Sequence, residues 1–328
     1  MPRSRGSAPR SNRDTASTRE VGVSVGHAVT SDHLLFLLMS LTWGVTWIAT
    51  KAGLSAVPPL FFGAARYILV SAVLVFAVGN LRRTYGGGRA LPIIITGALT
   101  IVGTYGLLYW GMLFVPSGVA GLVNMSMNPV CLFAFAILFG QEQATWRHAL
   151  ALLLGVAGMV VLFSDKASFS DAPRELLGAA AVVAAAPVYC LGVVLNRPLL
   201  RTVKPLDLAT AQSVVGAVGL TALSIAFEPV SPATFVALAS PEPLAGLLFV
   251  VIGGTFIGYT IFLHLIRDWG APRAGLYSFV SPVIALVLGA VVYAEPLTWR
   301  EIVGGAMALI AAAIAIAPRG LGKSRTSA

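Results

Sequence analysis

Two stretches, GQEQATWR at residues 140–147 and YAEPLTWR at residues 293–300, carry the same motif. Glu, Thr, Trp and Arg recur in both at the same spacing, and the second copy lies 153 residues after the first (142 to 295). A long apolar run follows each copy. The two stretches therefore mark equivalent points in two halves of the chain.

The duplication extends upstream of both motifs. Pro129 and Pro282 are also 153 residues apart, and Ala120-Gly121-Leu122 matches Ala274-Gly275-Leu276 at an offset of 154, so one residue has been gained or lost between. An offset close to half of the 328-residue chain predicts a duplicated half rather than a short solenoid repeat.

The composition is that of a membrane protein. Hydrophobic residues make up 57% of the chain and charged residues only 11%, with a mean hydropathy of +0.86, whereas a soluble protein carries roughly 25% charged residues. The net charge of +9 would suit a nucleic-acid-binding protein, but basic residues also flank membrane spans on the cytoplasmic side. We therefore expect no nucleic-acid partner. Cys131 and Cys190 lie in apolar runs, and we expect no disulfide, metal or other cofactor.

Ten apolar runs are long enough to cross a bilayer as helices, since a spanning helix needs about 20 mostly apolar residues. They lack the alternation of barrel strands. We predict an all-α integral membrane fold with ten transmembrane helices. The expected spans are residues 33–56, 60–79, 90–114, 117–139, 147–163, 174–196, 206–227, 243–266, 271–292 and 299–317.

The basic residues predict the orientation of the chain. With the N-terminus inside, the segments between spans hold 17 Lys and Arg on the inner side and 3 on the outer side, and Lys51 and Arg66 lie within spans. Under the positive-inside rule both termini are cytoplasmic. Because each half then has five spans, the second half enters the membrane upside down. This inverted-topology repeat is typical of transporters, in which the halves exchange conformations around a central site.

We divide the chain into two repeats and two tails. Residues 1–32 are polar and without the apolar core of a signal peptide, and we expect a disordered cytoplasmic tail. The first five-helix repeat covers residues 33–163 and the second covers 174–317, followed by a cytoplasmic tail at 318–328. A preference for Arg over Lys, with many Ala, Gly and Val residues, is typical of a bacterial source and predicts the inner membrane. The oligomeric state stays open, and a monomer is compatible with the sequence.

The motifs together resemble the EamA-type ten-helix permeases of the drug/metabolite transporter superfamily. The resemblance covers residues 33–317 and rests on Trp43-Gly44-Val45-Thr46-Trp47 with Lys51, on Ala65-Arg66-Tyr67, on the two proline-containing spans and on the two repeated turns. It implies a carrier of small metabolites or amino acids, most similar to exporters of aromatic and other amino acids. It also implies a central cavity lined by spans 1, 3, 4, 6, 8 and 9.

Charged side chains inside spans are costly, so each is a candidate for function. Lys51 lies near the outer end of its span, where it can snorkel to the interface or act at the cavity or its gate. Arg66 lies about two turns into its span, and we expect it to bond helix-end carbonyls, with substrate contact as the alternative. His264 is either an interfacial histidine or a proton-coupling group.

Acidic side chains are missing from the middle of every expected span. A buried carboxylate attracts a cationic drug and releases it on protonation, so proton-coupled drug antiport is disfavoured. Two cations without an anion favour carboxylate-bearing or zwitterionic substrates.

Two prolines and the polar side chains around them predict where the cavity lies. Pro129 and Pro282 each remove a helix hydrogen bond, so they are either hinges for alternating access or static kinks. Polar residues beside them can bind substrate or join helices, and Tyr109 can belong to the outer aromatic belt instead. The expected cavity residues are Trp43, Trp47, Lys51, Tyr105, Tyr109, Asn124, Asn128, Tyr189, Tyr259, Tyr277, Ser278 and Ser281.

The sequence thus predicts a secondary transporter that moves amino acids or related small metabolites across the lipid bilayer by alternating access. A permease for drugs, organic anions or nucleotide-type metabolites is the alternative within transport. A membrane-embedded enzyme would need a nucleophile with a base or a metal cluster, and we find neither in the spans. A channel is compatible with the repeat but is less favoured. The sequence contains no P-loop, so we expect no ATP motor.

Overall fold

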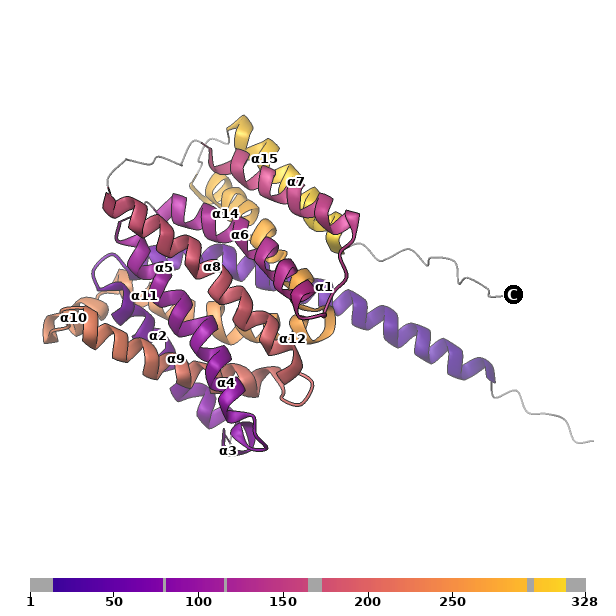
Figure 1. The fold of residues 1–328 in the computed structure, drawn as a ribbon, viewed down its shortest axis with the longest axis horizontal. Coiled ribbons are helices and arrows are strands. Elements are labelled where there is room, and N and C mark those ends of the chain that lie inside the picture. Colours follow the sequence, from indigo (N-terminus) through magenta and orange to yellow (C-terminus); the bar gives the residue numbers. More distant parts are fainter. Residues whose placement is uncertain (1–13, 79–80, 115–116, 165–172, 294–297, 317–328) are drawn as a thin grey trace, which may run out of the picture.

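The computed structural model describes residues 14–78, 81–114, 117–164, 173–293 and 298–316, and these form helices joined by short turns (Figure 1). Within these ranges there is no strand. Long apolar runs favour helices because a helix satisfies its own backbone hydrogen bonds where water is absent. The predicted all-α fold class is confirmed.

Apart from the start of α1, the helices of the first repeat coincide with the predicted spans to within a few residues. One additional short helix, α3, joins the second and third spans. The elements are α1 (Asp14–Gly53), α2 (Pro59–Val78), α3 (Leu81–Tyr85), α4 (Ala90–Gly97), η1 (Ala98–Gly103), α5 (Thr104–Met112), α6 (Ser117–Leu138) and α7 (Trp146–Phe163).

The second repeat follows the same order, with α10 and α13 as additional short helices. Its elements are α8 (Pro173–Leu199), α9 (Pro205–Phe227), α10 (Pro232–Leu238), α11 (Pro241–Phe249), η2 (Val250–Tyr259), α12 (Thr260–Trp269), α13 (Ala271–Ala274), α14 (Tyr277–Tyr293) and α15 (Trp299–Ile316).

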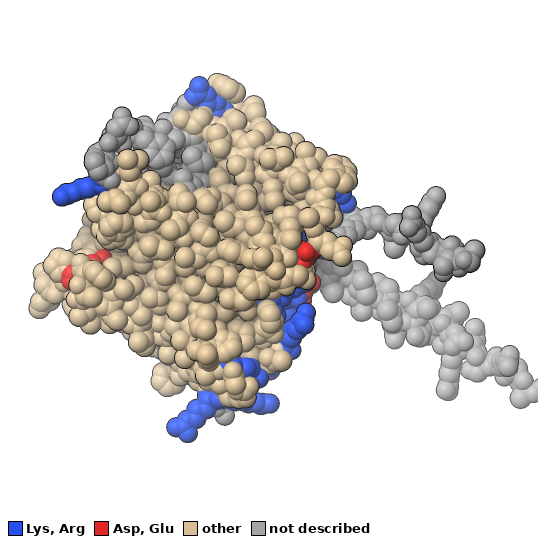
Figure 2. Space-filling model, viewed as in Figure 1, with Lys and Arg blue, Asp and Glu red and all other residues tan. Residues whose placement is uncertain are grey.

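Several of these helices are long and apolar enough to cross a membrane. In the described part of the chain, five segments meet that condition: Pro59–Phe76, Ala90–Met112, Leu176–Leu199, Pro205–Phe227 and Pro241–Trp269. Asn124–Leu138 and Trp146–Leu162 are shorter apolar helices. Figure 2 shows a broad face of the molecule without Lys, Arg, Asp or Glu, with charged residues gathered towards its edges. The protein is a multi-pass integral membrane protein.

The N-terminal segment differs from the prediction of a disordered tail over residues 1–32. Helix α1 already begins at Asp14, so residues 14–32 are helical, while residues 1–13 lie outside the described residues. No proline occurs between Asp14 and Gly53. A spanning helix that is already formed can be extended by polar residues without a new nucleation cost, which polarity alone does not reveal.

Helices that are equivalent in the two repeats pack against each other. This holds for α2 with α9 and for α7 with α15, the two most extensive helix pairs. A side chain at Gly158 would meet the backbone nitrogen of Ala308, and one at Gly304 would meet that of Leu162. The later residue of α7 thus faces the earlier residue of α15, so the two helices are antiparallel. Equivalent helices that run in opposite directions are what an inverted repeat produces.

The repeated Thr-Trp-Arg motif begins the last helix of each repeat. Thr145 is the N-cap of α7, and its hydroxyl accepts a hydrogen bond from the backbone N–H of His148 at 3.4 Å. At α15, the Thr298 hydroxyl accepts from the N–H of Glu301 at 3.3 Å, and the Glu301 carboxylate accepts from the N–H of Thr298 at 2.9 Å. This reciprocal pair is a capping box, so the motif determines where these helices start.

Each repeat also contains a π-helical segment at the same place in its third span. These are η1, between α4 and α5, and η2, between α11 and α12. Thr104 donates from its hydroxyl to the carbonyl of Leu99 at 2.7 Å, and Thr255 donates to that of Val250 at 3.3 Å, in both cases five residues back. Such segments are rare and are frequently found at functional sites.

Candidate functional site

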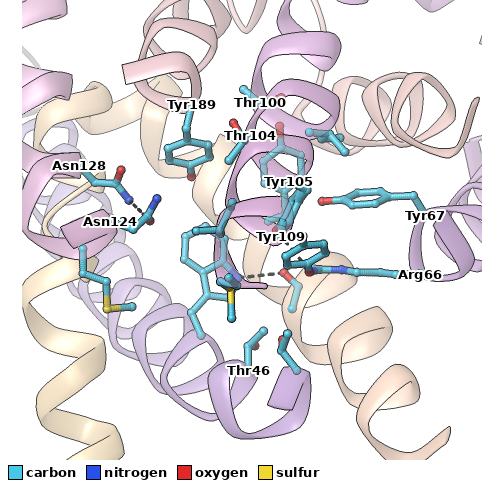
Figure 3. Close-up of a pocket in the computed structure, with 18 of the residues that line it drawn as sticks. Thr46, Arg66, Tyr67, Thr100, Thr104, Tyr105, Tyr109, Asn124, Asn128 and Tyr189 are labelled. Atoms are coloured by element: carbon cyan, nitrogen blue, oxygen red, sulfur yellow. Dashed lines mark hydrogen bonds between the residues drawn. The ribbon is translucent and has the colours of Figure 1, made fainter. Parts of the chain in front are cut away.

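A cavity lies between the two repeats and receives side chains from both (Figure 3). Its empty volume is about 960 Å³, counting the part that is open to solvent. It reaches Thr50 and Met112, near the ends of α1 and α5 that the predicted topology places outside. The lining residues are Trp43, Thr46, Thr50, Arg66, Tyr67, Thr100, Ile101, Thr104, Tyr105, Leu108, Tyr109, Met112, Asn124, Met125, Asn128, Tyr189, Gly254, Tyr259 and Tyr277.

One side of the cavity, the arginine wall, consists of Arg66, Tyr67, Tyr105 and Tyr109 (Figure 3). Nε and Nη2 of Arg66 donate to the Thr255 hydroxyl at 3.1 and 2.9 Å, and Nη1 donates to the Tyr105 hydroxyl at 3.3 Å. The guanidinium carbon lies 5.2 Å from the ring centroid of Tyr67 and 5.5 Å from that of Tyr105, within cation–π range. Hydroxyls and π faces thus surround the charge.

On the opposite side, Asn124 and Asn128 form the asparagine wall (Figure 3). Asn128 Nδ2 donates to Asn124 Oδ1 at 3.2 Å, so the two amides on α6 hold each other in place. The thiol of Cys190 on α8 donates to the backbone carbonyl of Asn128 at 3.4 Å. This wall presents neutral polar groups that can bind a polar part of a substrate.

Aromatic rings make up the aromatic wall, which contains Trp43, Tyr189 and Tyr277. The Trp43 ring packs edge-on against Tyr277, with centroids 4.3 Å apart, and lies 5.1 Å from Phe262. Its indole N–H donates to the carbonyl of Gly254 in η2 at 2.9 Å. Trp43 therefore links α1 to the π-helical segment of the other repeat and presents an apolar surface to the cavity.

Most of the residues that we expected in the cavity line it together. These are Trp43, Tyr105, Tyr109, Asn124, Asn128, Tyr189, Tyr259 and Tyr277. Tyr109 is buried, unlike its neighbour Trp110, which is exposed, so Tyr109 does not belong to an outer aromatic belt. Trp47 and Lys51 lie on α1, but their side chains are outside the described part of the structure, and their predicted roles stay predictions.

Two expected residues, Ser278 and Ser281, are buried but do not line the cavity. Ser281 donates to the backbone carbonyl of Ser40 at 2.8 Å and so joins α14 to α1. The Ser278 hydroxyl is buried without a hydrogen-bond partner among the described residues. We predicted a cavity position for both serines because they are close to Pro282 in the sequence. Proximity in sequence does not show which face of the helix a serine lies on, so it cannot separate a serine that joins helices from one that lines the cavity.

The structure corrects two expectations about the second span. Arg66 bonds the hydroxyls of Thr255 and Tyr105 rather than helix-end carbonyls. In addition, α2 lines the cavity through Arg66 and Tyr67, although the family resemblance implied spans 1, 3, 4, 6, 8 and 9. We also missed the threonines of the lining. Thr100 and Thr104 recur at a spacing of four residues in the third span, a pattern that places them on one helix face.

The prolines and His264 lie outside the cavity lining. Pro129 and Pro282 are buried inside α6 and α14, and their hinge role stays a prediction. His264 is in the middle of α12, and its Nε2 lies 3.4 Å from Asp32 of α1 and 3.3 Å from Asp268. Trp269 donates to the same Asp32 at 3.2 Å. This cluster connects α1 and α12 at the predicted inner face.

A buried amide lies next to the cavity, on its predicted inner side. Gln212 of α9 has no exposed surface. Its Oε1 accepts from the Tyr259 hydroxyl at 2.6 Å, and its Nε2 donates to Thr96 Oγ1 and to Asn196 Oδ1, both at 2.7 Å. Tyr259 lines the cavity, while Thr96 and Asn196 lie on α4 and α8 towards the predicted inner face. The hydrogen bonds therefore join α4, α8 and η2 to α9 on the predicted inner side of the cavity.

Comparisons with known proteins agree with this arrangement. A "Probable terminal-alkyne amino-acid exporter" of Streptantibioticus cattleyicolor is 29% identical over 88% of this chain and 94% of its own. A "Probable amino-acid metabolite efflux pump" of Salmonella typhimurium is 24% identical over 84% of this chain and 91% of its own. A crystal structure with 22% identity matches the fold with a TM-score of 0.73, over 88% of this chain and 96% of that one.

The family model identifies the same duplication as the sequence and the packing. The EamA-like transporter family matches twice, over residues 30–164 and over residues 176–317, and these segments contain the two inverted sets of helices. The family is one of transporters, in agreement with the prediction that the protein is not an enzyme. The chain belongs to the EamA-like transporter family of the drug/metabolite transporter superfamily.

Proposed function

We propose that this transporter is a secondary carrier of amino acids or closely related small metabolites, and that it works by alternating access at the central cavity. The observation that carries the proposal is the cavity between two inverted repeats, which combines one buried guanidinium, a pair of amides and several aromatic rings. An amino acid offers a carboxylate, an ammonium group and a side chain, and each has a matching surface here.

The shape of the cavity supports alternating access. It reaches the predicted outer ends of α1 and α5, while the hydrogen bonds of Gln212 join α4, α8 and η2 to α9 on its predicted inner side. An inverted repeat can interchange two such halves, so that the inner side opens as the outer side closes. Pro129 and Pro282, inside equivalent helices, are the positions where we place the bending.

The names of relatives support the substrate class. One relative is called a probable exporter of terminal-alkyne amino acids and another a probable amino-acid metabolite efflux pump. The absence of acidic residues from the described cavity lining argues in the same direction, because a site for cationic drugs needs a negative charge.

Uptake into proteoliposomes tests the proposal. Purified protein is reconstituted and exposed to radiolabelled aromatic, aliphatic and polar amino acids and to an organic cation, each with and without a pH gradient. We expect saturable amino-acid flux above that of empty vesicles, and competition among the amino acids. Flux that requires the gradient would make His264 the first residue to replace. Flux of the organic cation alone, or no flux of any compound, would contradict the proposal.

A further inference from the structure

Arg66 and Gln212 occupy equivalent positions in the two repeats. Each lies seven residues after the proline that begins its helix (59 to 66 in α2, 205 to 212 in α9). These two helices pack against each other, as equivalent elements near a two-fold axis do.

The partners of these two residues are also equivalent. Arg66 donates to the hydroxyl of Tyr105, and the hydroxyl of Tyr259 donates to Gln212. Tyr105 and Tyr259 are 154 residues apart, which is the offset of the Ala-Gly-Leu pair in the repeat. Tyr105 lies in α5, two residues after the end of η1, Tyr259 is the last residue of η2, and both line the cavity. The same structural position is therefore filled once by a cation and once by a neutral amide.

The two positions differ in how fully the protein occupies their hydrogen-bonding groups. The carbonyl of Gln212 accepts one bond and its amide group donates two, all to buried residues. A guanidinium has five N–H donors, and those of Arg66 make three hydrogen bonds within the described chain, two of them to the single oxygen of Thr255. Arg66 thus retains donors that an additional ligand can use.

The charge of Arg66 is also not neutralised by any described carboxylate, since the ion pairs of the described residues involve other cations. An arginine cannot lose its proton in a protein, and a buried charge without a counter-charge is costly. The rings of Tyr67 and Tyr105 offset part of this cost. An anion that enters the cavity would offset much more of the cost of burying the charge. A planar carboxylate suits this role because it can accept two parallel hydrogen bonds from a guanidinium.

We propose that Arg66 is the anion-binding residue of the cavity and holds the carboxylate of an organic acid whose apolar body lies against the aromatic wall. The proposal rests on the transport function proposed above and deepens it by naming the group that the site recognises. Gln212, the equivalent residue of the second repeat, is uncharged, so only the first repeat contributes a charged group that can bind the carboxylate. The ammonium group of an amino acid would then face the asparagine wall.

Binding of three related probes to the full-length protein in detergent tests the proposal. The probes are L-phenylalanine, 3-phenylpropionate, which lacks the ammonium group, and phenethylamine, which lacks the carboxylate. Binding is followed by tryptophan fluorescence and by thermal shift. Because a hydrogen bond to a charged group contributes more than a neutral one, we expect the two carboxylates to bind at least about tenfold more tightly than the amine. Equal binding of all three, or binding of the amine alone, would overturn the proposal.

Arg66→Gln is the decisive variant because it places in the first repeat the residue that the second repeat carries at this position. We expect the preference for carboxylates over the amine to disappear. Arg66→Lys keeps the charge but cannot make two parallel bonds, and we expect it to lower the preference several-fold. The matched control is Arg89→Gln, since Arg89 bonds the backbone carbonyls of Gly86 and Arg83 between α3 and α4 and does not line the cavity.

Two results would contradict the assignment of Arg66: a preference in Arg66→Gln that equals that of the wild type, or, if this variant does not fold, an unchanged preference in Arg66→Lys. The transport function proposed above can be contradicted independently of the anion site. Loss of selectivity in the variant without flux in proteoliposomes would leave the anion site standing and remove the transport proposal. Amino-acid flux with unaltered selectivity in the variant would do the reverse.

Discussion

Gln212 is a residue whose importance follows from its surroundings. It is completely buried and bonds three other side chains, Thr96, Asn196 and Tyr259, which come from three different spans. A polar network of this kind stabilises the fold only while each member has its partner. Gln212 therefore acts as a joint between both repeats at the predicted inner side of the cavity.

We expect Gln212→Met, which keeps the length of the side chain, to lower stability clearly. Each buried polar group left without a partner costs about 1–3 kcal/mol, so the melting temperature in detergent should fall by several degrees. Gln143→Met, at an exposed position, is the control and should melt like the wild type. Equal melting temperatures for Gln212→Met and the wild type would show that the network does not support the fold.

Individual cavity residues could be predicted from the sequence only in part. Most of the expected cavity residues were aromatic or amide side chains inside apolar runs, where such groups are conspicuous. The roles of Arg66 and Gln212 depend on partners that are far away in the chain, such as Thr255 for Arg66 and Thr96 for Gln212. Spacing within one helix cannot predict which hydroxyl of another helix lies opposite.

At the scale of the helices, the contact between α7 and α15 depends on glycine. A Cβ atom at Gly304 would lie 2.5 Å from the carbonyl oxygen of Gly158, well inside contact distance. A Cβ atom at the adjacent Gly305 would come no closer than an ordinary 3.5 Å to any atom, a methyl group of Val283. Small residues allow this close packing in membranes.

We therefore expect Gly304→Ala to push the two helices apart and to destabilise the protein by about 1–3 kcal/mol, the usual cost of overpacking. Gly305→Ala, one residue away on the same helix, should have little effect. Thermal unfolding in detergent measures both. Neither helix lines the cavity, so the half-saturation constant for transport should stay the same in both variants. A Gly304→Ala protein as stable as Gly305→Ala would contradict the close contact.

The limits of the helices were predictable because apolar runs, prolines and capping threonines mark them directly. The π-helical segments were not, since η1 and η2 lie inside long apolar runs and contain no proline themselves. The helical conformation of residues 14–32 was missed as well. In both cases the conformation depends on the helix that continues on either side and not on local composition.

The whole molecule carries a prediction about orientation. Arg82 lies on the short helix α3, after the second span, and Arg174 lies at the start of α8. Both are exposed, and the distribution of Lys and Arg places them on opposite sides of the membrane.

A membrane-impermeant maleimide tests this topology after Cys131 and Cys190 have been replaced by serine. In intact cells that express the protein, we expect labelling of Arg174→Cys and none of Arg82→Cys. Disruption of the membrane should make Arg82→Cys reactive as well. Labelling of both positions in intact cells, or of Arg82→Cys alone, would contradict the inward orientation of the termini.

The unequal pair formed by Arg66 and Gln212 has a kinetic consequence. A carrier without an energy source cannot accumulate its substrate, so the ratio of maximal rates in the two directions must equal the ratio of the two half-saturation constants. In the proposed alternating-access cycle, a guanidinium at this position in only one repeat makes the inward-open and outward-open forms chemically different, although the helices around them are related by symmetry. Transport that starts from the face with the lower half-saturation constant must therefore also have the lower maximal rate, and the two directions are expected to show different saturation curves.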